Sequence, residues 1–161
     1  MNVLVRGAAP QDAPALLGLI RDLAEYERLD PPDAEAQARL LEDLFGPKPR
    51  IEAYLAEIDG EAVGYAIVLE TYSSFLARPT LYLEDLFVRP DRRRRGAGRA
   101  MLRYLAAEAA ARGCGRMEWV VLTWNELARG VYRNLGAEEL DGWRVCRLDR
   151  EGLERLAGES A

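Results

Sequence analysis

The chain has 161 residues, of which 49% are apolar and 30% are charged, so we expect one folded domain over residues 1–161 and exclude wholesale disorder. It contains no histidine, which excludes a Ser-His-Asp or Cys-His catalytic centre and any His-ligated metal site. The formal net charge of −5 argues against a nucleic-acid-binding role for the protein as a whole.

The N-terminal part of the chain predicts one short strand followed by two helices. The strand covers Val3–Val5, and Asp12 is expected to cap a first helix that runs to about Arg28. Asp33 is expected to cap a second helix that closes at Gly46. The apolar residues of the first helix recur at helical spacing and are Leu16, Leu17, Ile20, Leu23 and Ala24.

The middle of the chain predicts a β-hairpin and a buried strand. Ile51–Ile58 and Ala62–Leu69 flank Asp59 and Gly60, a residue pair that favours a type I′ turn. Thr80–Val88 is apolar at both alternating positions, which predicts a central strand covered on both faces.

The C-terminal half predicts alternating helices and strands. In order these are a helix over 98–112, a strand over Arg116–Thr123, a helix capped by Asn125 that runs to Leu135, a strand over Trp143–Leu148 and a tail helix containing Leu153 and Leu156. The whole order predicts an α/β fold with a mixed central β-sheet and helices on both faces.

An arginine-rich turn between the strand over 80–88 and the next helix is the strongest local signal. Residues 89–99 contain six arginines and one aspartate, a charge of +5, so the remaining residues together carry −10. Gly96 and Gly98 would let the backbone approach a ligand, and the helix beginning there offers N–H groups and a positive dipole end. This pattern predicts a cradle for a diphosphate, although solvated arginines, or an RNA or DNA contact through Arg92–Arg95, remain alternatives.

The complete arrangement resembles the GNAT superfamily of acetyl-CoA-dependent N-acetyltransferases, whose signature Arg/Gln-x-x-Gly-x-Gly/Ala is matched by Arg93, Gly96 and Gly98. Further segments resemble the diamine (spermidine/spermine) acetyltransferase branch, namely Leu23–Glu27, Tyr82–Val88, Trp124–Glu126, Val131–Ala137 and Gly142–Arg144. The resemblance implies the GNAT fold, a homodimer, and direct transfer of an acetyl group to a primary amine of a small cationic acceptor such as a diamine or polyamine.

The resemblance also implies which residues contact acetyl-CoA. They are Leu86, Phe87, Val88, Arg93, Arg94, Arg95, Gly96, Ala97, Gly98, Arg99, Asn125 and Tyr132. Helical geometry places Tyr132 roughly 85° from the centre of its helix's apolar stripe, where an ordinary half-buried tyrosine remains an alternative. Its implied role is that of the general acid that protonates the CoA thiolate.

Two acids interrupt the apolar strand over 80–88. A lone ionised carboxylate there costs several kcal/mol unless it is paired, so Glu84 and Asp85 could form structural ion pairs with arginines, and alternation predicts opposite faces for them. The resemblance instead implies that Glu84 binds the amine cation and relays its proton, directly or through a water. It adds Tyr26, Glu27, Asp85 and Asp141 to the amine pocket.

Other functions remain open at this point. The acceptor could be a thialysine-like amino acid or a protein lysine, although the charge of −10 outside the turn favours acceptors with several positive charges. A non-catalytic domain that only senses acetyl-CoA is an alternative of another class.

The sequence also predicts the cellular setting. No apolar run approaches the roughly 20 residues that span a bilayer, and the N-terminal segment lacks the apolar stretch of a signal peptide. Cys114 and Cys146 form no close pair and are expected to remain thiols. We therefore expect a cytoplasmic protein that associates with neither membrane nor nucleic acid and holds no metal.

Overall fold

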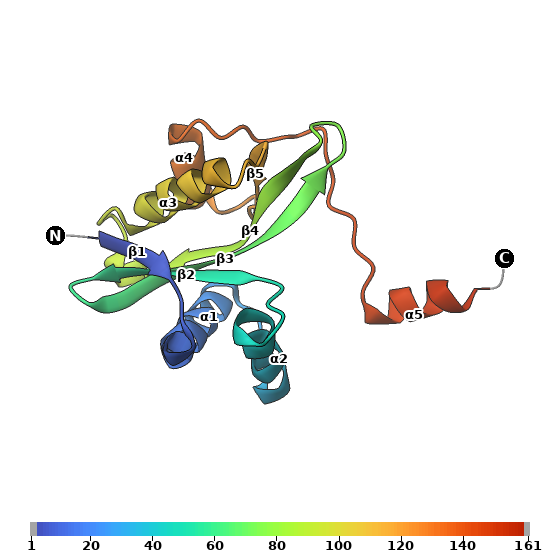
Figure 1. Ribbon diagram of the computed structural model, residues 1–161, viewed down its shortest axis with the longest axis horizontal. Helices are drawn as coiled ribbons and strands as arrows, with labels where there is room; N and C mark the ends of the chain where they lie inside the picture. Colours follow the sequence, from blue (N-terminus) through green and yellow to red (C-terminus); the bar gives the residue numbers. More distant parts are fainter. Residues whose placement is uncertain (1–2, 160–161) are drawn as a thin grey trace. The chain divides into compact units, whose positions relative to one another are not determined.

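The computed structural model describes residues 3–159 and is shown in Figure 1. Its contacts divide the chain into two compact units, the first ending at Val120 and the second beginning at Val121. Each unit is described separately below. The expected single domain over residues 1–161 stays a prediction.

The first unit is built on a five-stranded mixed sheet with the strand order β1-β2-β3-β4-β5 (Figure 1). Neighbouring strands are antiparallel except for β4 and β5, which are parallel. The strands are β1 (Val3–Gly7), β2 (Glu52–Ile58), β3 (Glu61–Ser73), β4 (Arg78–Val88) and β5 (Arg116–Glu118). A parallel pair needs a crossover connection, which α3 (Ala97–Ala111) supplies here.

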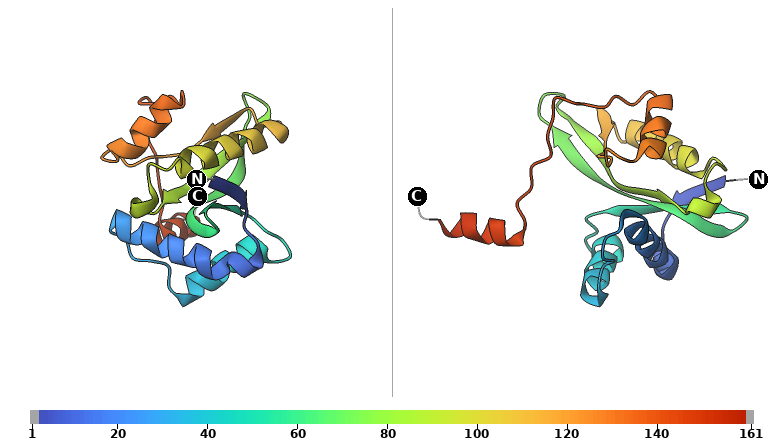
Figure 2. Two further views of the ribbon diagram at one scale, coloured as in Figure 1. Left: turned by 90° about the vertical axis from the view of Figure 1, so that its left-hand side faces the viewer. Right: turned by 180° about the vertical axis from the view of Figure 1, so that it is seen from behind.

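Helices cover both faces of this sheet, which confirms the predicted fold class (Figure 2). On one face lie α1 (Ala13–Glu27) and α2 (Ala34–Phe45), and on the other lies α3. The core between the sheet and the first two helices consists of Leu16, Leu19, Leu44, Ala53, Leu55, Tyr65, Ile67 and Phe87. Short 3-10 turns precede α1 at Pro10–Asp12 and α3 at Pro90–Arg92.

The start of α1 differs from the prediction in two details. The Asp12 carboxylate does not cap the helix, because it accepts the Ala9 N–H at 2.8 Å and an Arg6 guanidinium N–H at 2.7 Å. The buried stripe includes Leu19, which the sequence analysis left out, whereas Leu17 is only half-buried. The predicted cap of α2 is confirmed, since the Asp33 carboxylate accepts the Ala36 N–H at 2.8 Å.

The predicted hairpin turn is confirmed by positive φ angles of 52° at Asp59 and 80° at Gly60. The predicted alternation of side-chain directions along β4 is wrong at Glu84, because the register with β3 shifts at this residue. Asp85 pairs with Ile67 but Leu83 pairs with Val68, which leaves Glu84 as an extra residue. This β-bulge interrupts the alternation from which opposite faces were predicted for the two acids.

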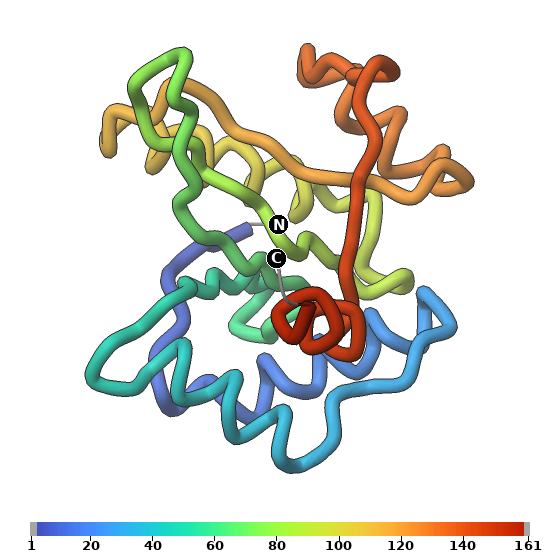
Figure 3. The backbone as a smooth tube through the Cα atoms, turned by 90° about the vertical axis from the view of Figure 1, so that its right-hand side faces the viewer, coloured from blue at the N-terminus to red at the C-terminus, as the bar shows by residue number. Residues whose placement is uncertain are grey.

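The second unit contains α4 (Glu126–Asn134) and α5 (Arg150–Gly158). The strand predicted over Arg116–Thr123 is shorter, since β5 ends at Glu118. The strand predicted over Trp143–Leu148 is wrong: Figure 3 shows an extended trace there that leads into α5, with no strand partner within residues 121–159. A strand needs a neighbour for its backbone hydrogen bonds, and the alternation of apolar residues alone does not supply one.

The predicted tail helix is confirmed as α5. Its N-terminus is capped by Asp149, whose carboxylate accepts the Gly152 N–H at 2.8 Å. None of the helices within residues 3–159 has the length and apolar character needed to cross a bilayer.

Candidate active site

The arginine-rich turn has the backbone geometry of an anion-binding loop. Arg94 and Gly96 both adopt left-handed conformations, with φ of 61° and 85°, and α3 begins directly afterwards at Ala97. No side chain caps this helix, so the N–H groups of its first turn have no partner within the helix or at its cap. Backbone N–H groups and the helix dipole both favour a negatively charged ligand at this end of α3.

The protein's own packing does not require a glycine at position 98. A Cβ atom added there would meet only the Val88 Cγ2 atom, at an ordinary contact distance of 3.8 Å. Gly96 differs, because its positive φ by itself favours glycine. The open space above Gly98 fits the close approach of a ligand such as the diphosphate of acetyl-CoA.

The strand leading into this turn has a free edge. β5 pairs with β4 only from Thr80 to Tyr82, so within residues 3–159 the stretch from Leu83 to Val88 has no sheet partner on its β5 side. Unpaired backbone N–H and C=O groups on a strand edge can bind an extended ligand. The Phe87 side chain is buried in the core, so this residue could offer a ligand only its backbone.

Two arginines of the turn hold the protein together. Arg89 pairs with Asp22 of α1 at 2.8 Å, and Arg92 pairs with Glu61 of β3 at 2.6 Å. For these two, the alternative of solvated arginines is wrong. The side chains of Arg94, Arg95 and Arg99 are exposed.

Arg93, the first residue of the predicted signature, makes two kinds of contact with the protein through its guanidinium group. Its Nε donates to the Val88 carbonyl at 2.9 Å. Its guanidinium carbon lies 4.4 Å from the centroid of the Tyr26 ring and 5.8 Å from that of Phe87. These cation–π contacts connect the turn to the C-terminal end of α1, where Tyr26 and Glu27 lie.

A group of acids lies beside this connection. The Tyr65 hydroxyl donates to the Asp85 carboxylate at 3.1 Å. Burial, together with the negative charges of Glu84 and Glu27, raises the pKa of Asp85 to about 6, although the Tyr65 hydrogen bond acts in the opposite direction. The structure therefore brings together Tyr26, Glu27, Glu84 and Asp85 from the predicted amine pocket.

Within residues 3–159, the two acids of β4, Glu84 and Asp85, do not form the ion pairs with arginines that the sequence analysis gave as an alternative. Glu84, at the bulge, is exposed, whereas Asp85 is half-buried. In the described part of the chain neither forms an ion pair with an arginine, so that alternative is wrong. Sequence reasoning also missed Tyr65. A tyrosine in an otherwise apolar strand needs a partner for its hydroxyl, and this was the available signal.

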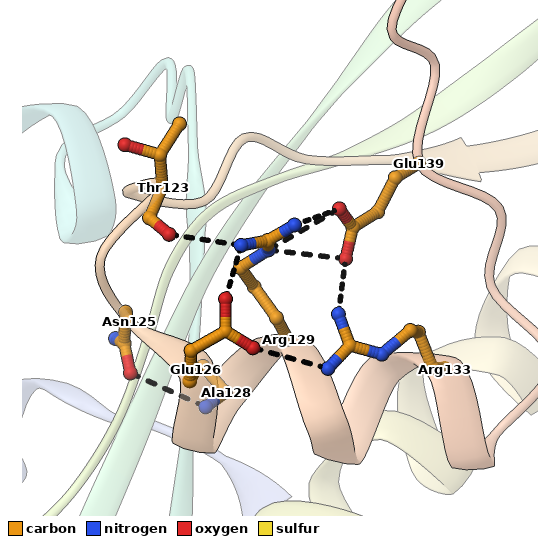
Figure 4. Close-up of polar contacts among 7 residues, drawn as sticks. All are labelled: Thr123, Asn125, Glu126, Ala128, Arg129, Arg133 and Glu139. Atoms are coloured by element: carbon orange, nitrogen blue, oxygen red, sulfur yellow. Dashed lines mark hydrogen bonds and ion pairs between the residues drawn. The ribbon is translucent and has the colours of Figure 1, made fainter.

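In the second unit, two of the residues predicted to contact acetyl-CoA belong to α4 and its cap: Asn125 precedes the helix (Figure 4), and Tyr132 lies within it. Asn125 caps the helix, since its Oδ1 accepts the Ala128 N–H at 3.2 Å, and its amide NH₂ remains a donor for a ligand. Tyr132 is half-buried, and burial raises the pKa of its phenol, which keeps the hydroxyl protonated as a general acid requires.

An ion-pair network fastens both ends of α4 (Figure 4). Arg129 donates to the Thr123 carbonyl at 2.9 Å, pairs with Glu139 at 2.6 Å and also pairs with Glu126. Arg133 joins Glu126 and Glu139 at 3.2 and 3.0 Å. The segments before and after the helix are thereby held together.

Asp141, predicted for the amine pocket, also lies in the second unit. The pKa of Arg129 is raised chiefly by its hydrogen bond to Glu139, and the charge of Asp141 adds to this. The sequence predicts that Asn125, Tyr132 and Asp141 contact the same ligands as residues of the first unit, and this stays a prediction.

Comparison with known proteins identifies the family. Residues 16–137 match the acetyltransferase (GNAT) family. The chain belongs to this family. This GNAT acetyltransferase is 36% identical to the thialysine N-epsilon-acetyltransferase of Bos taurus, over 98% of both chains. It is 28% identical to the L-ornithine N5-acetyltransferase of Arabidopsis thaliana, over 94% of this chain and 86% of that one. It is 33% identical to the spermidine/spermine N(1)-acetyltransferase-like protein 1 of Homo sapiens, over 96% of this chain and 24% of that one.

Solved structures share the fold of this GNAT acetyltransferase. An integron cassette protein from V. cholerae has a TM-score of 0.85, with 22% identity over 99% of both chains. AAC(6')-Iy, solved with the bisubstrate analogue CoA-S-monomethyl-acetylneamine, has a TM-score of 0.75, with 22% identity over 93% of this chain and 99% of that one. The predicted GNAT fold and the predicted acyltransferase class are confirmed, and the resemblance to the diamine acetyltransferase branch is consistent with the relatives.

Proposed function

We propose that this acetyltransferase moves an acetyl group from acetyl-CoA directly to a primary amine of a small cationic acceptor. The observation that carries the proposal is the acidic group of Glu27, Glu84 and Asp85, which adjoins the Arg93–Tyr26 contact at the arginine-rich turn. Carboxylates at this place would bind an ammonium group next to the proposed cofactor site.

The residues of the turn would hold the cofactor. We assign the diphosphate to Arg93–Arg99, where Gly98 leaves space and the first turn of α3 offers N–H groups. The pantetheine arm would follow the free edge of Leu86–Val88, and its reactive end would meet Asn125 and Tyr132. Bound acetyl-CoA supplies a thioester carbonyl for attack by the amine.

The acceptor must lose a proton before it can attack. An alkyl amine with a pKa near 10.4 needs roughly 4.6 kcal/mol to deprotonate at pH 7. Glu84 would take this proton, directly or through a water, because its exposed position at the bulge lets the proton pass to solvent. Tyr132 would protonate the leaving thiolate, since burial holds its phenol in the protonated form.

The acceptor is proposed to be a diamine or polyamine, because residues outside 89–99 carry a net −10 that attracts several positive charges. A thialysine-like amino acid is the second candidate, favoured by the 36% identity to the bovine thialysine enzyme. The test is CoA release with spermidine, 1,3-diaminopropane, thialysine and ornithine. If thialysine or ornithine has a higher kcat/KM than both spermidine and 1,3-diaminopropane, the polyamine assignment is wrong. The assignment of acetyltransferase activity would still hold.

We also propose a homodimer and a cytoplasmic location. The homodimer draws on exposed apolar side chains of the second unit, among them Trp143, Val145 and Leu153. The location draws on Cys114 and Cys146, which are both free thiols, the state typical of a reducing compartment.

A further inference from the structure

Tyr65 is the largest fully buried side chain of the first unit, and its hydroxyl, the one polar atom of the side chain, forms a hydrogen bond to Asp85. Its ring lies in the core beneath α1, 6.4 Å from the ring of Phe87. Its hydroxyl donates to Asp85 Oδ2 at 3.1 Å. A buried hydroxyl without a partner costs free energy, so this bond satisfies the tyrosine and directs one carboxylate oxygen of Asp85 at the same time.

The strand register explains why these two side chains meet. Tyr65 pairs with Phe87, and Asp85 pairs with Ile67, so Tyr65 and Asp85 are diagonal neighbours on the face covered by α1 and α2. Diagonal neighbours are within reach of long aromatic side chains. The bulge at Glu84 lies just beyond this pair and does not disturb it.

The other titratable groups that act on Asp85 come from two elements. Glu84 precedes it on β4, and Glu27 approaches from the end of α1. Burial and both of these charges disfavour the ionised Asp85 carboxylate. Among the described groups that act on it, the Tyr65 hydroxyl is the one that favours ionisation.

We propose that Tyr65 is a positioning residue for acceptor binding: its hydroxyl orients the Asp85 carboxylate and keeps it charged, and so sets the lowest pH at which the enzyme binds a cationic amine. This inference rests on the proposed function, because it takes Asp85 as part of the amine pocket. Tyr65 itself does not contact the acceptor. An ammonium group near Asp85 would add the positive charge that the described surroundings of this carboxylate lack.

The test compares Tyr65→Phe with Tyr54→Phe. Tyr54 is a matched control, because it is also a buried strand tyrosine whose hydroxyl donates to a carboxylate, that of Glu52 at 3.0 Å. The Glu52 carboxylate pairs with Arg112 and is not among the proposed site residues. Both variants remove one oxygen atom from the core and keep the ring. The readouts are kcat/KM for 1,3-diaminopropane from pH 5.5 to 9, acetyl-CoA affinity and thermal stability.

In Tyr65→Phe we expect the acidic limb of kcat/KM to move to higher pH by about one pH unit or more, the size of a lost hydrogen bond to a charged group. At pH 6.5 KM should rise with little change in kcat, and acetyl-CoA affinity should stay the same. Tyr54→Phe should leave the acidic limb where it is. An unmoved limb in Tyr65→Phe, or an equal movement in both variants, would overturn the proposal.

A direct titration separates this inference from the proposed function. Carbon-13 NMR of the Asp85 carboxyl should give a pKa near 6 in the wild type, and a higher pKa in Tyr65→Phe. If the wild type acetylates no cationic amine, the proposed function fails while this measurement still tests the Tyr65 bond. If the amine is acetylated but the Asp85 pKa is equal in both proteins, the inference alone fails.

Discussion

At Asp85, burial raises the pKa of the carboxyl to about 6, so between about pH 4 and 6 the folded chain holds a proton there that the unfolded chain releases. The folded state thus gains stability from this group at low pH and loses it as the pH rises through 6. The loss amounts to about 3 kcal/mol at pH 8. A half-buried carboxylate that lowers the free energy of unfolding at neutral pH is typical of a residue that the protein needs for binding.

We therefore expect Asp85→Asn to be more stable than the wild type at pH 8, by up to about 3 kcal/mol. The advantage should shrink as the pH falls from 6 to 4, because the folded wild-type chain then takes up a proton at Asp85 and no longer buries a charged carboxylate. Urea unfolding at pH 4.5 and 8 measures it, with the exposed Asp30→Asn as the control. A stability difference that is the same at both pH values would contradict the raised pKa.

A substitution of Gly98 tests whether the cofactor binds at the arginine-rich turn. A valine there should weaken acetyl-CoA binding strongly and leave the fold intact, since the added Cβ meets only Val88 Cγ2 at 3.8 Å. Calorimetric titration measures the affinity. Gly18→Val in α1 is the control, because a Cβ atom there meets nothing within 4 Å. If Gly98→Val binds acetyl-CoA as tightly as the wild type does, the diphosphate does not bind at this turn.

Tyr132→Phe removes a proton donor and almost no volume. We expect kcat to fall roughly 10²–10⁴-fold, the usual contribution of a general acid, with acetyl-CoA affinity nearly unchanged. Tyr72→Phe, at an exposed tyrosine of β3, is the control. If chemistry limits the rate and the loss is below about threefold, Tyr132 is an ordinary half-buried tyrosine and the proton comes from elsewhere.

At the scale of elements, two helix caps and one tight turn could be predicted from the sequence because their determinants are local. The caps at Asp33 and Asn125 each need one side chain and an N–H three residues on, and the hairpin at Asp59 and Gly60 needs two positive φ angles. The cap predicted at Asp12 is wrong, because its carboxylate binds Arg6 and the Ala9 N–H instead. The strand over Trp143–Leu148 could not be predicted from alternation, because a strand depends on a partner that is distant in sequence.

The site was predictable to the extent that it depends on sequence motifs. The turn over residues 93–99 and the acids at the ends of α1 and in β4 were identified from the sequence. Which acid is buried was not, since the extra residue at Glu84 changes the side-chain direction without altering composition. The ion pairs of Arg89 and Arg92 could not be predicted for a similar reason. Their partners Asp22 and Glu61 lie far away in sequence.

The ion-pair network around α4 makes a prediction for that element. Arg129→Gln removes the contacts to Thr123, Glu126 and Glu139, so we expect faster amide hydrogen exchange over residues 126–134. The difference from the wild type should shrink at high salt, because exposed ion pairs are screened. Arg150→Gln is the control, since Arg150 pairs with Glu154 of the same helix, α5. Unchanged exchange in Arg129→Gln would show that the network does not hold the helix.

At the scale of the whole molecule, we propose that the exposed apolar residues of the second unit form an association surface. The side chains of Trp143 and Val145 are 78% and 73% exposed, and Leu153 and Leu156 on α5 are exposed as well. We expect a homodimer at micromolar concentration. Sedimentation measures this, and Trp143→Ser combined with Val145→Ser should weaken it, with Phe75→Ser on the β3–β4 hairpin as the control. A wild-type monomer of 18.0 kDa would contradict the prediction.

The extra residue in β4 also determines which change of length this strand should tolerate. Leu83 pairs with Val68 and Asp85 pairs with Ile67, so these two β4 side chains lie on opposite faces of the sheet although one residue separates them. A regular strand of the same length would instead turn Leu83 to the face of Asp85 and Phe87, where α1 and α2 already fill the space. A homologous β4 that is one residue shorter at this point should therefore replace this strand without changing its register, and the exchange would cost the Glu84 carboxylate alone.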